Sequence, residues 1–229
     1  MAEAGAPAAG RQRRALPGPL YLVTDRAQTG GRPLVSVVEA ALRGGARWVQ
    51  LRENDLTGLA LTQLGEELRA ATRRHGAMLL VNDRVDVALA VDADGAHLAR
   101  SSMRPADVRP LVGAAGWIGA SAHTLEEAVE AEASGADFVV FGPVFATPSK
   151  APYGPPVGLV ALRAARLALA LPVLAIGGIK AENLEQVAKG GADGFAVISA
   201  ILSDPNPEAA TRLLLEAWRR AGGSDRGRD

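Results

Sequence analysis

The sequence predicts a single (β/α)8 TIM barrel, an α/β fold, on three observations. Eight short apolar runs recur along the chain, and most are continuous rather than alternating, as expected for strands buried on both faces. A stretch with helical periodicity follows each run, and roughly 200 residues suit eight such units in one compact barrel. An open doubly wound sheet is the alternative, but the chain lacks the G-x-G-x-x-G turn that is typical of many such sheets.

The expected elements follow directly from these patterns. The strands are expected at 20–24, 48–51, 78–81, 95–98, 117–121, 138–141, 173–176 and 195–198. The helices are expected at 34–43, 59–75, 85–91, 105–112, 125–134, 159–170, 181–189 and 207–221. Pro105 and Pro207 stand where proline is favoured at the start of a helix. Gly44, Gly113 and Gly190 stand where helices are expected to end.

One folded domain is expected over residues 20–221, because no linker-like segment divides it. Residues 1–19 are rich in Ala, Gly and Pro and lack the continuous apolar segment of a secretory signal. They are interpreted as a disordered amino-terminal tail, with a transit peptide as the less favoured reading. Residues 222–229 are expected to fray, and a cytoplasmic location is the default expectation.

The composition excludes several classes of function. No cysteine occurs, which excludes disulfides, thiolate zinc sites, iron–sulfur clusters and cysteine nucleophiles. Lys plus Arg number 25 and Asp plus Glu number 25, and aromatic residues make up 4%, so no nucleic-acid partner is indicated. No apolar run reaches the roughly 20 residues that span a bilayer, so no membrane partner is expected. Small molecules are the expected partners, and a homo-oligomer is compatible with the sequence.

Polar residues gather where the predicted strands end, which is where the active sites of such barrels lie. They are Gln50, Arg52, Asn82, Asp83, Arg100, Ser102, Ser121 and His123. Charged groups beside buried strands carry a desolvation cost unless they have partners. They therefore form either salt bridges at the rim or one convergent ligand site. His97, inside the fourth predicted strand, is interpreted as a packed structural residue.

Two further segments suggest phosphate binding. Gly177 and Gly178 follow the seventh predicted strand and Ser199 follows the eighth, the placement of a phosphate site in barrels of this kind. Glycine lets backbone N–H groups approach an anion closely. The loop after the sixth strand holds Thr147, Ser149 and Lys150, two hydroxyls and an ammonium that could surround a pyrophosphate.

Six ordered motifs resemble the thiamine phosphate synthase family, over about residues 20–218. They are YLVTD at 21–25, VQLRE at 49–53, VNDR at 81–84, SAHT at 121–124, FGPVFATPSK at 141–150 and AIGGI at 175–179. The resemblance implies a transferase that joins hydroxymethylpyrimidine pyrophosphate to a thiazole phosphate, releasing thiamine phosphate and pyrophosphate. The same superfamily contains thiazole tautomerases.

The resemblance also implies roles for individual residues. Those expected to hold the pyrimidine and its pyrophosphate are Gln50, Arg52, Asn82, Ser149 and Lys150. Asp83 is expected to bind Mg²⁺, and Ser121 to stabilise the leaving group or the pyrimidine. The thiazole phosphate is expected to contact Thr147, Gly178 and Ser199, with Gly177 beside them.

The chain departs from the family pattern at three positions. Asn54 stands in place of a Lys, Arg100 in place of a Gln, and Ser102 in place of the Asp that gives Mg²⁺ its second carboxylate. Arg100 is expected to replace the lost Lys in holding pyrophosphate. The missing carboxylate resembles the metal-independent tautomerase branch, in which a His at the position of His123 is the acid and base. A synthase, a tautomerase and a non-catalytic binder of thiazole or thiamine phosphate therefore stay open at this point.

Overall fold

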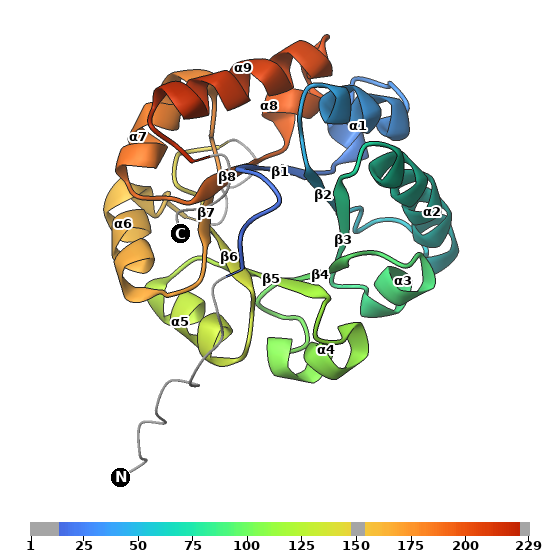
Figure 1. Cartoon of the computed structure of the whole chain (residues 1–229), viewed down its shortest axis with the longest axis horizontal. Coiled ribbons are helices and arrows are strands. Elements are labelled where there is room, and N and C mark those ends of the chain that lie inside the picture. Colours follow the sequence, from blue (N-terminus) through green and yellow to red (C-terminus); the bar gives the residue numbers. More distant parts are fainter. Residues whose placement is uncertain (1–13, 148–153, 225–229) are drawn as a thin grey trace.

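The computed structural model describes residues 14–147 and 154–224, and these form one closed barrel (Figure 1). Its parallel strands pair in sequence order, and β1 pairs with β8 to close the ring. The strands are β1 (Leu20–Val23), β2 (Trp48–Leu51), β3 (Met78–Asn82), β4 (Gly95–Leu98), β5 (Trp117–Ala122), β6 (Phe138–Phe141), β7 (Val173–Ile176) and β8 (Gly194–Val197). The predicted (β/α)8 barrel is confirmed.

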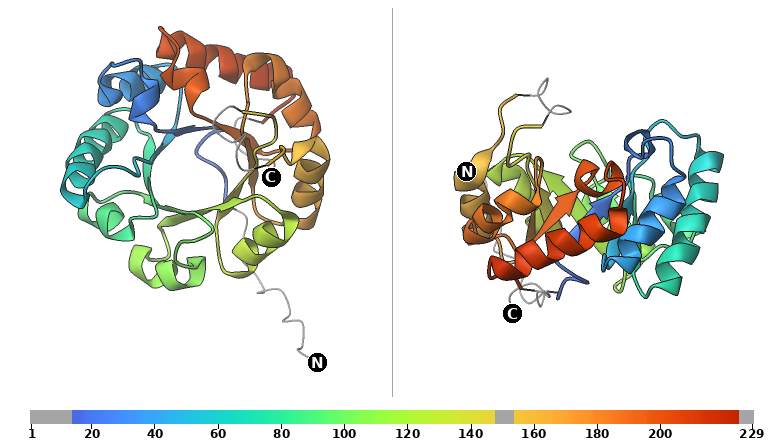
Figure 2. Two further views of the ribbon diagram at one scale, coloured as in Figure 1. Left: turned by 180° about the vertical axis from the view of Figure 1, so that it is seen from behind. Right: turned by 90° about the horizontal axis from the view of Figure 1, so that it is seen from above.

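The helices surround the strands as an outer ring (Figures 1 and 2). They are α1 (Leu34–Arg43), α2 (Gly58–Arg74), α3 (Val85–Ala90), α4 (Pro105–Val112), α5 (Leu125–Ala133), α6 (Gly158–Ala168), α7 (Leu184–Lys189), α8 (Ser199–Leu202) and α9 (Pro207–Arg220), with 3-10 turns η1 (Arg26–Gln28) and η3 (Ala181–Asn183). No helix among these described residues is both long and apolar enough to cross a membrane.

One of the predicted helices differs from the structure. The helix expected at 181–189 is divided into η3 and α7, because the side chain of Asn183 accepts the backbone N–H of Lys180 at 2.9 Å and donates to the carbonyl of Gly178 at 2.8 Å. These two bonds hold a tight first turn. Ser199 opens the short helix α8, which is absent from the predicted helices, and the last helix, α9, begins at Pro207 as predicted.

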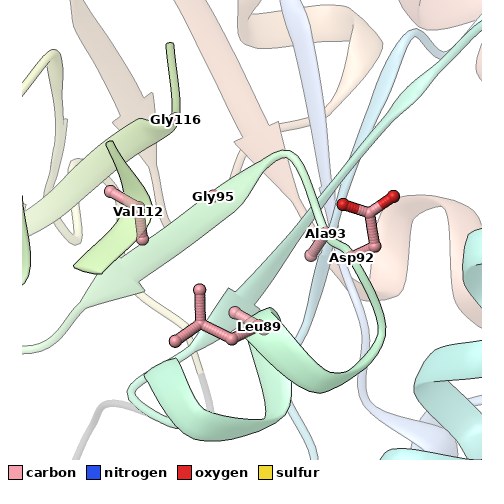
Figure 3. Close-up of a pocket in the computed structure, with 7 residues that line it drawn as sticks. Leu89, Asp92, Ala93, Gly95, Val112 and Gly116 are labelled. Carbon is pink, nitrogen blue, oxygen red and sulfur yellow. The ribbon is translucent and has the colours of Figure 1, made fainter. Parts of the chain in front are cut away.

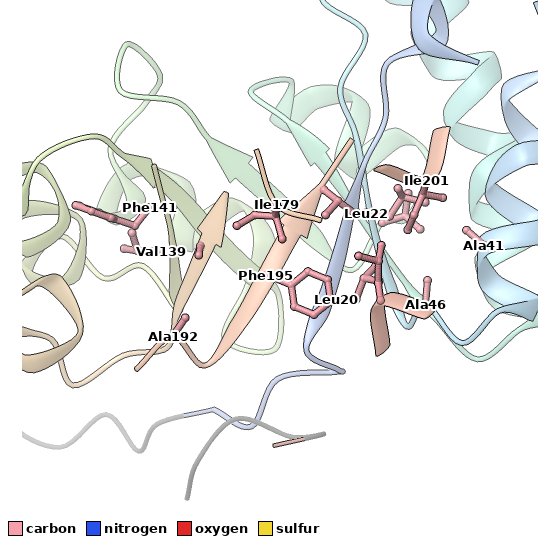
Figure 4. Close-up of a cluster of buried hydrophobic side chains, with 14 of the residues drawn as sticks. Leu20, Leu22, Ala41, Ala46, Val139, Phe141, Ile179, Ala192, Phe195 and Ile201 are labelled. Atoms are coloured by element: carbon pink, nitrogen blue, oxygen red, sulfur yellow. The ribbon is translucent and has the colours of Figure 1, made fainter. Parts of the chain in front are cut away.

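Alternate residues of each strand face the helices or the barrel interior. Leu20, Leu22 and Phe195 face outward and pack beneath the helices (Figure 4), with the ring of Phe195 centred 5.3 Å from that of Trp218 on α9. The interior is filled by a second cluster that includes Tyr21, Trp48, Trp117 and Phe138. The Tyr21 and Trp48 rings lie 4.4 Å apart, so aromatic packing fills this part of the barrel.

The chain before β1 contacts the amino-terminal end of the barrel. Residues 14–19 belong to the tail that the sequence predicts over residues 1–19, whereas in the structure Leu16 is 3% exposed and joins the interior cluster. Arg14 lies over the Trp117 ring at 3.8 Å and donates to the carbonyl of Gly116 at 3.1 Å. Its guanidinium also faces Asp137 at 3.5 Å. This segment therefore covers the end of the interior opposite the predicted site.

Candidate functional site

The carboxyl-terminal part of the barrel interior is divided into a polar and an apolar half. On β2 to β5 the inward positions hold Gln50, Asn82, His97 and Ser121, and strand pairing aligns Asn82 with His97 and His97 with Gly119. On β1 and β6 the comparable positions are Val23 and Val140 of the apolar interior cluster, and Ile176 on β7 and Ile198 just after β8 pack against that cluster. A ligand above this layer therefore meets hydrogen-bonding groups on one side and aliphatic groups on the other.

Two hydrogen bonds organise the polar half. The amide Nε2 of Gln50, which is 3% exposed, donates to the Tyr21 hydroxyl at 3.3 Å. Burial raises the pKa of Tyr21 far above its usual value, so the hydroxyl stays protonated. The Nε2 of His97 lies 2.9 Å from Oγ of Ser121. Burial lowers the pKa of His97 to about 3, Asp83 opposes this shift, and the positive charge of Arg52 adds to it.

Asp83 lies at the end of β3, exposed at the mouth of the barrel and in the left-handed region with φ 58°. Its Oδ2 accepts from the amide of Asn82 at 2.9 Å. Its Oδ1 accepts from the backbone N–H of Ala99 at 2.9 Å and from the hydroxyl of Ser102. The described residues contain no cluster of three or more His, Asp or Glu side chains suited to a metal ion. Asp83 and Ser102 thus form an all-oxygen pair with one carboxylate.

Arg52 follows β2, and its backbone N–H donates to Oγ1 of Thr24 at 2.9 Å. Within the described chain its half-buried guanidinium makes no ion pair. The next residue, Glu53, is 6% exposed and accepts the backbone N–H of Arg26 at 3.1 Å and its guanidinium at 3.3 Å. Glu53 therefore fixes the β1–α1 loop, while Arg52 keeps its charge available for an anion.

Arg100, Glu127 and His123 form a second group at the rim. The Arg100 side chain is 77% exposed, and its Nε lies 3.1 Å from Oε1 of Glu127 on α5. The other oxygen of Glu127 accepts the backbone N–H of His123 at 2.8 Å and lies 3.3 Å from His123 Nδ1. One carboxylate thus joins the loop after β4 to the loop after β5.

The loop after β6 lies against the turn after β7. The backbone N–H of Phe145 donates to the carbonyl of Gly177 at 3.1 Å. This bond places the chain just before Thr147 next to the turn after β7. Gly178 has φ +65°, and a Cβ added there would lie 2.7 Å from Cβ of Phe145. In the side view of Figure 2 the described segments of this loop extend away from the barrel.

The structure therefore brings most of the predicted site residues to one end of the barrel. Ser199 opens α8 directly after β8, which pairs with β7, and it is exposed there. Ser149 and Lys150 lie outside the described residues.

Two hollows near the amino ends of the strands contain none of the predicted site residues. One, of about 130 Å³, is lined by Leu89, Asp92 and Val112 among others (Figure 3), and the other, of about 550 Å³, is lined by Arg47, Arg212 and Arg219 among others.

Sequence reasoning missed two residues of this site. In the sequence, Tyr21 is one residue of an apolar strand at 20–24, and nothing in that strand indicates that its hydroxyl forms a hydrogen bond with Gln50. Glu127 could have been found, because it follows His123 by four residues at the start of a helix, where its side chain can reach back to the backbone before that helix.

Known proteins resemble this chain over most of its length. The family model described as thiamine monophosphate synthase matches residues 20–201. The thiamine-phosphate synthase of Roseiflexus castenholzii is 50% identical over 200 residues, covering 87% of both chains. That of Moorella thermoacetica is 45% identical over 204 residues, covering 89% of this chain and 97% of its own.

A solved structure agrees with these relatives. The thiamine phosphate pyrophosphorylase of Pyrococcus furiosus superposes with a TM-score of 0.81 at 40% identity, covering 89% of this chain and 96% of its own. The family match over residues 20–201 spans every strand of the barrel, from β1 to β8. The chain therefore belongs to the thiamine monophosphate synthase family.

Proposed function

We propose that the chain joins hydroxymethylpyrimidine pyrophosphate to a thiazole phosphate, giving thiamine phosphate and pyrophosphate. The observation that carries this proposal is the placement of Gln50, Asn82 and Ser121 in one polar half of the barrel mouth, with Arg52 and Asp83 directly after the ends of β2 and β3. Amides and a hydroxyl suit a pyrimidine with ring nitrogens and an amino group. A cation beside them suits its pyrophosphate.

The reaction breaks the bond between the pyrimidine methylene carbon and the pyrophosphate oxygen, and the bonding electrons leave with the oxygen. The thiazole nitrogen then donates its lone pair to the methylene cation. Such a reaction needs positioned charge on the leaving group more than it needs a base. Arg52 supplies that charge, and we assign a second cation to Lys150 and a third to Arg100.

The aliphatic half of the layer has a role in the same scheme. Val23, Val140, Ile176 and Ile198 offer no hydrogen bond to water. A methylene cation that met water would be hydrolysed instead of joined to the thiazole. We propose that these side chains keep water from the reacting carbon. The thiazole phosphate is then held after the ends of β6, β7 and β8, by Thr147, Gly177, Gly178 and Ser199.

The synthase function implies Mg²⁺, and the residues at Asp83 fit it with one carboxylate. Asp83 is exposed at the mouth, and the hydroxyl of Ser102 lies beside it, so both available donors are oxygens. Mg²⁺ commonly keeps several waters and binds substrate phosphates for its other positions. When bound, Mg²⁺ would neutralise charge on the pyrophosphate. Asp83 would hold it, and Asn82 and the backbone of Ala99 orient the carboxylate.

One observation favours a second candidate, a metal-independent thiazole tautomerase. The Nδ1 of His123 faces Glu127 at 3.3 Å, which leaves Nε2 as the nitrogen that can exchange a proton at the rim. Incubating both synthase substrates with Mg²⁺ and measuring pyrophosphate separates the candidates. Prompt release is the expected result. Isomerisation of a carboxylated thiazole phosphate without release would instead support the tautomerase, and binding without turnover would indicate a non-catalytic binder.

A further inference from the structure

The two ring nitrogens of His97 have unequal surroundings. The side chain is buried inside the barrel, and Nε2 lies 2.9 Å from Oγ of Ser121. Nδ1 is also buried, and within residues 14–147 and 154–224 it has no hydrogen-bond partner. On that side the ring abuts the backbone of Gly119, because a Cβ added to Gly119 would lie 2.5 Å from Nδ1.

This asymmetry determines where the proton of the imidazole resides. A buried N–H without an acceptor is rare in proteins, and an unsatisfied acceptor is tolerated more often. A proton on Nδ1, either alone or in the doubly protonated ring, would be such an N–H. No buried N–H is left without an acceptor when Nε2 carries the proton and donates a hydrogen bond to Ser121, while Nδ1 keeps its lone pair.

The direction of this hydrogen bond fixes the role of the Ser121 hydroxyl. When Oγ accepts from His97, its own proton is free to be donated elsewhere. Ser121 lies half-buried at the end of β5, and Oγ makes no other hydrogen bond to the described residues. Its free proton can therefore be directed to a ligand at the mouth of the barrel.

We propose that His97 is a positioning residue that holds Ser121 as a hydrogen-bond donor to the departing pyrophosphate. The role rests on the proposed synthase function. A donated proton stabilises the oxygen that gains negative charge as the bond breaks, so the effect falls on turnover more than on substrate affinity. Without His97, the hydroxyl could rotate and lose this orientation.

Packing alone is the competing explanation, since the His97 ring contacts Tyr21 and Phe138, with centroids 5.9 Å and 5.8 Å apart. The two explanations differ for a matched pair of variants. His97→Gln keeps an N–H donor at a reach similar to Nε2, whereas His97→Leu fills space without a donor. Packing predicts that both variants behave alike, or that Leu is the better substitute. Positioning predicts that only Gln preserves turnover.

The first experiment measures the tautomer independently of activity. The chain has three histidines, so long-range ¹H–¹⁵N correlation on ¹⁵N-histidine-labelled protein resolves them, and His97 is identified as the signal missing from His97→Gln. The expected pattern is a protonated Nε2 and a bare Nδ1. A proton on Nδ1 would overturn the proposal, because Ser121 would then donate to His97 and not to the ligand.

The second experiment is a kinetic cycle with Ser121→Ala. His97→Leu is expected to lower kcat about tenfold with little change in KM, which corresponds to about 1.4 kcal/mol. His97→Gln is expected to stay near the wild-type rate. In the Ser121→Ala background His97→Leu should have no further effect, and an equal additional loss there would contradict positioning. If the wild-type chain releases no pyrophosphate, the proposed function fails and the leaving-group role with it, while the spectrum still reports the His97 tautomer.

Discussion

The hydroxyl of Ser102 donates a hydrogen bond to Oδ1 of Asp83. Sequence comparison with the family pattern placed Ser102 where a second carboxylate is expected, and the structure puts its side chain in direct contact with the first one. The two positions therefore share one site even though this chain carries a hydroxyl at the second. A carboxylate at residue 102 would face Asp83 at the position where we propose that Mg²⁺ binds.

Ser102→Asp is expected to lower the Mg²⁺ concentration that gives half-maximal pyrophosphate release about tenfold, because two carboxylates attract the cation more strongly than one. In the absence of Mg²⁺ the same variant should unfold at a lower temperature, since like charges in contact repel. Ser102→Asn is the neutral control of matching size. Equal Mg²⁺ dependence in the two variants would contradict the shared site.

Mg²⁺ is expected to bind the unmodified chain negligibly unless pyrophosphate is present. Asp83 offers one carboxylate, and its oxygens already accept hydrogen bonds from Asn82, Ala99 and Ser102. Calorimetric titration of Mg²⁺ with and without pyrophosphate measures this difference directly. Tight binding to the free chain would indicate a ligand that the described residues do not show.

Arg52→Ala is expected to lower turnover by roughly 10²-fold, because it removes the positive charge that stabilises the departing pyrophosphate. Arg52→Lys should recover part of the loss, since the charge returns without the planar guanidinium. Arg104→Ala is a suitable control, because that exposed arginine pairs with Asp107 in the first turn of α4, the helix that it precedes. Comparable losses in the Arg104 and Arg52 variants would show that general surface charge, rather than Arg52, governs the rate.

Gly178→Ala is expected to raise the dissociation constant of thiazole phosphate at least tenfold, about 1.4 kcal/mol. The added Cβ would lie 2.7 Å from Cβ of Phe145, so it would displace the β6–α6 loop rather than simply occupy the phosphate position. Gly30→Ala is a close control, because Gly30 has φ +64° and no atom within 4 Å of the added Cβ. Both variants share the backbone strain, and only Gly178→Ala should lose affinity. Equal affinities by calorimetry would remove Gly178 from the site.

Glu127→Gln is expected to raise KM for the pyrophosphate-bearing substrate several-fold at low salt. The carboxylate holds Arg100 and His123 together, and its charge fixes the orientation of the exposed guanidinium. The effect should shrink at high salt, because exposed charges are screened. Glu126→Gln removes the same charge from the same helical turn and should leave KM unchanged. A matching rise in that control would point to the net charge of the helix end.

The sequence was informative where local pattern decides structure. Continuous apolar runs are typical of strands buried on both faces, so the sequence alone places residues at their ends, such as Asp83 and Ser121, at one end of the barrel. Contacts between loops could not be predicted in this way. That Glu53 pairs with Arg26, and Glu127 with Arg100, depends on which loops become neighbours after the barrel closes.

The amino-terminal segment shows the same limit. Leu16 is a single leucine among Ala, Gly and Pro residues, and without periodicity nothing in the sequence indicates that it is buried in the barrel. Its burial depends on the size of the interior space left between Trp48, Trp117 and Phe138, which belong to strands far from it along the chain.

The covered amino end of the barrel constrains the order of events in turnover. With Leu16 beneath the aromatic cluster and Arg14 against Trp117, the part of the barrel that the structure describes is covered at its amino end, which leaves the carboxyl end as the route for ligands to the interior layer. Both substrates must then arrive, and both products depart, through the same opening. A molecule seated against Gln50 and Ser121 cannot leave while another covers it. Steady-state kinetics should therefore be sequential with a compulsory order, and the product that binds nearer the rim should be released first.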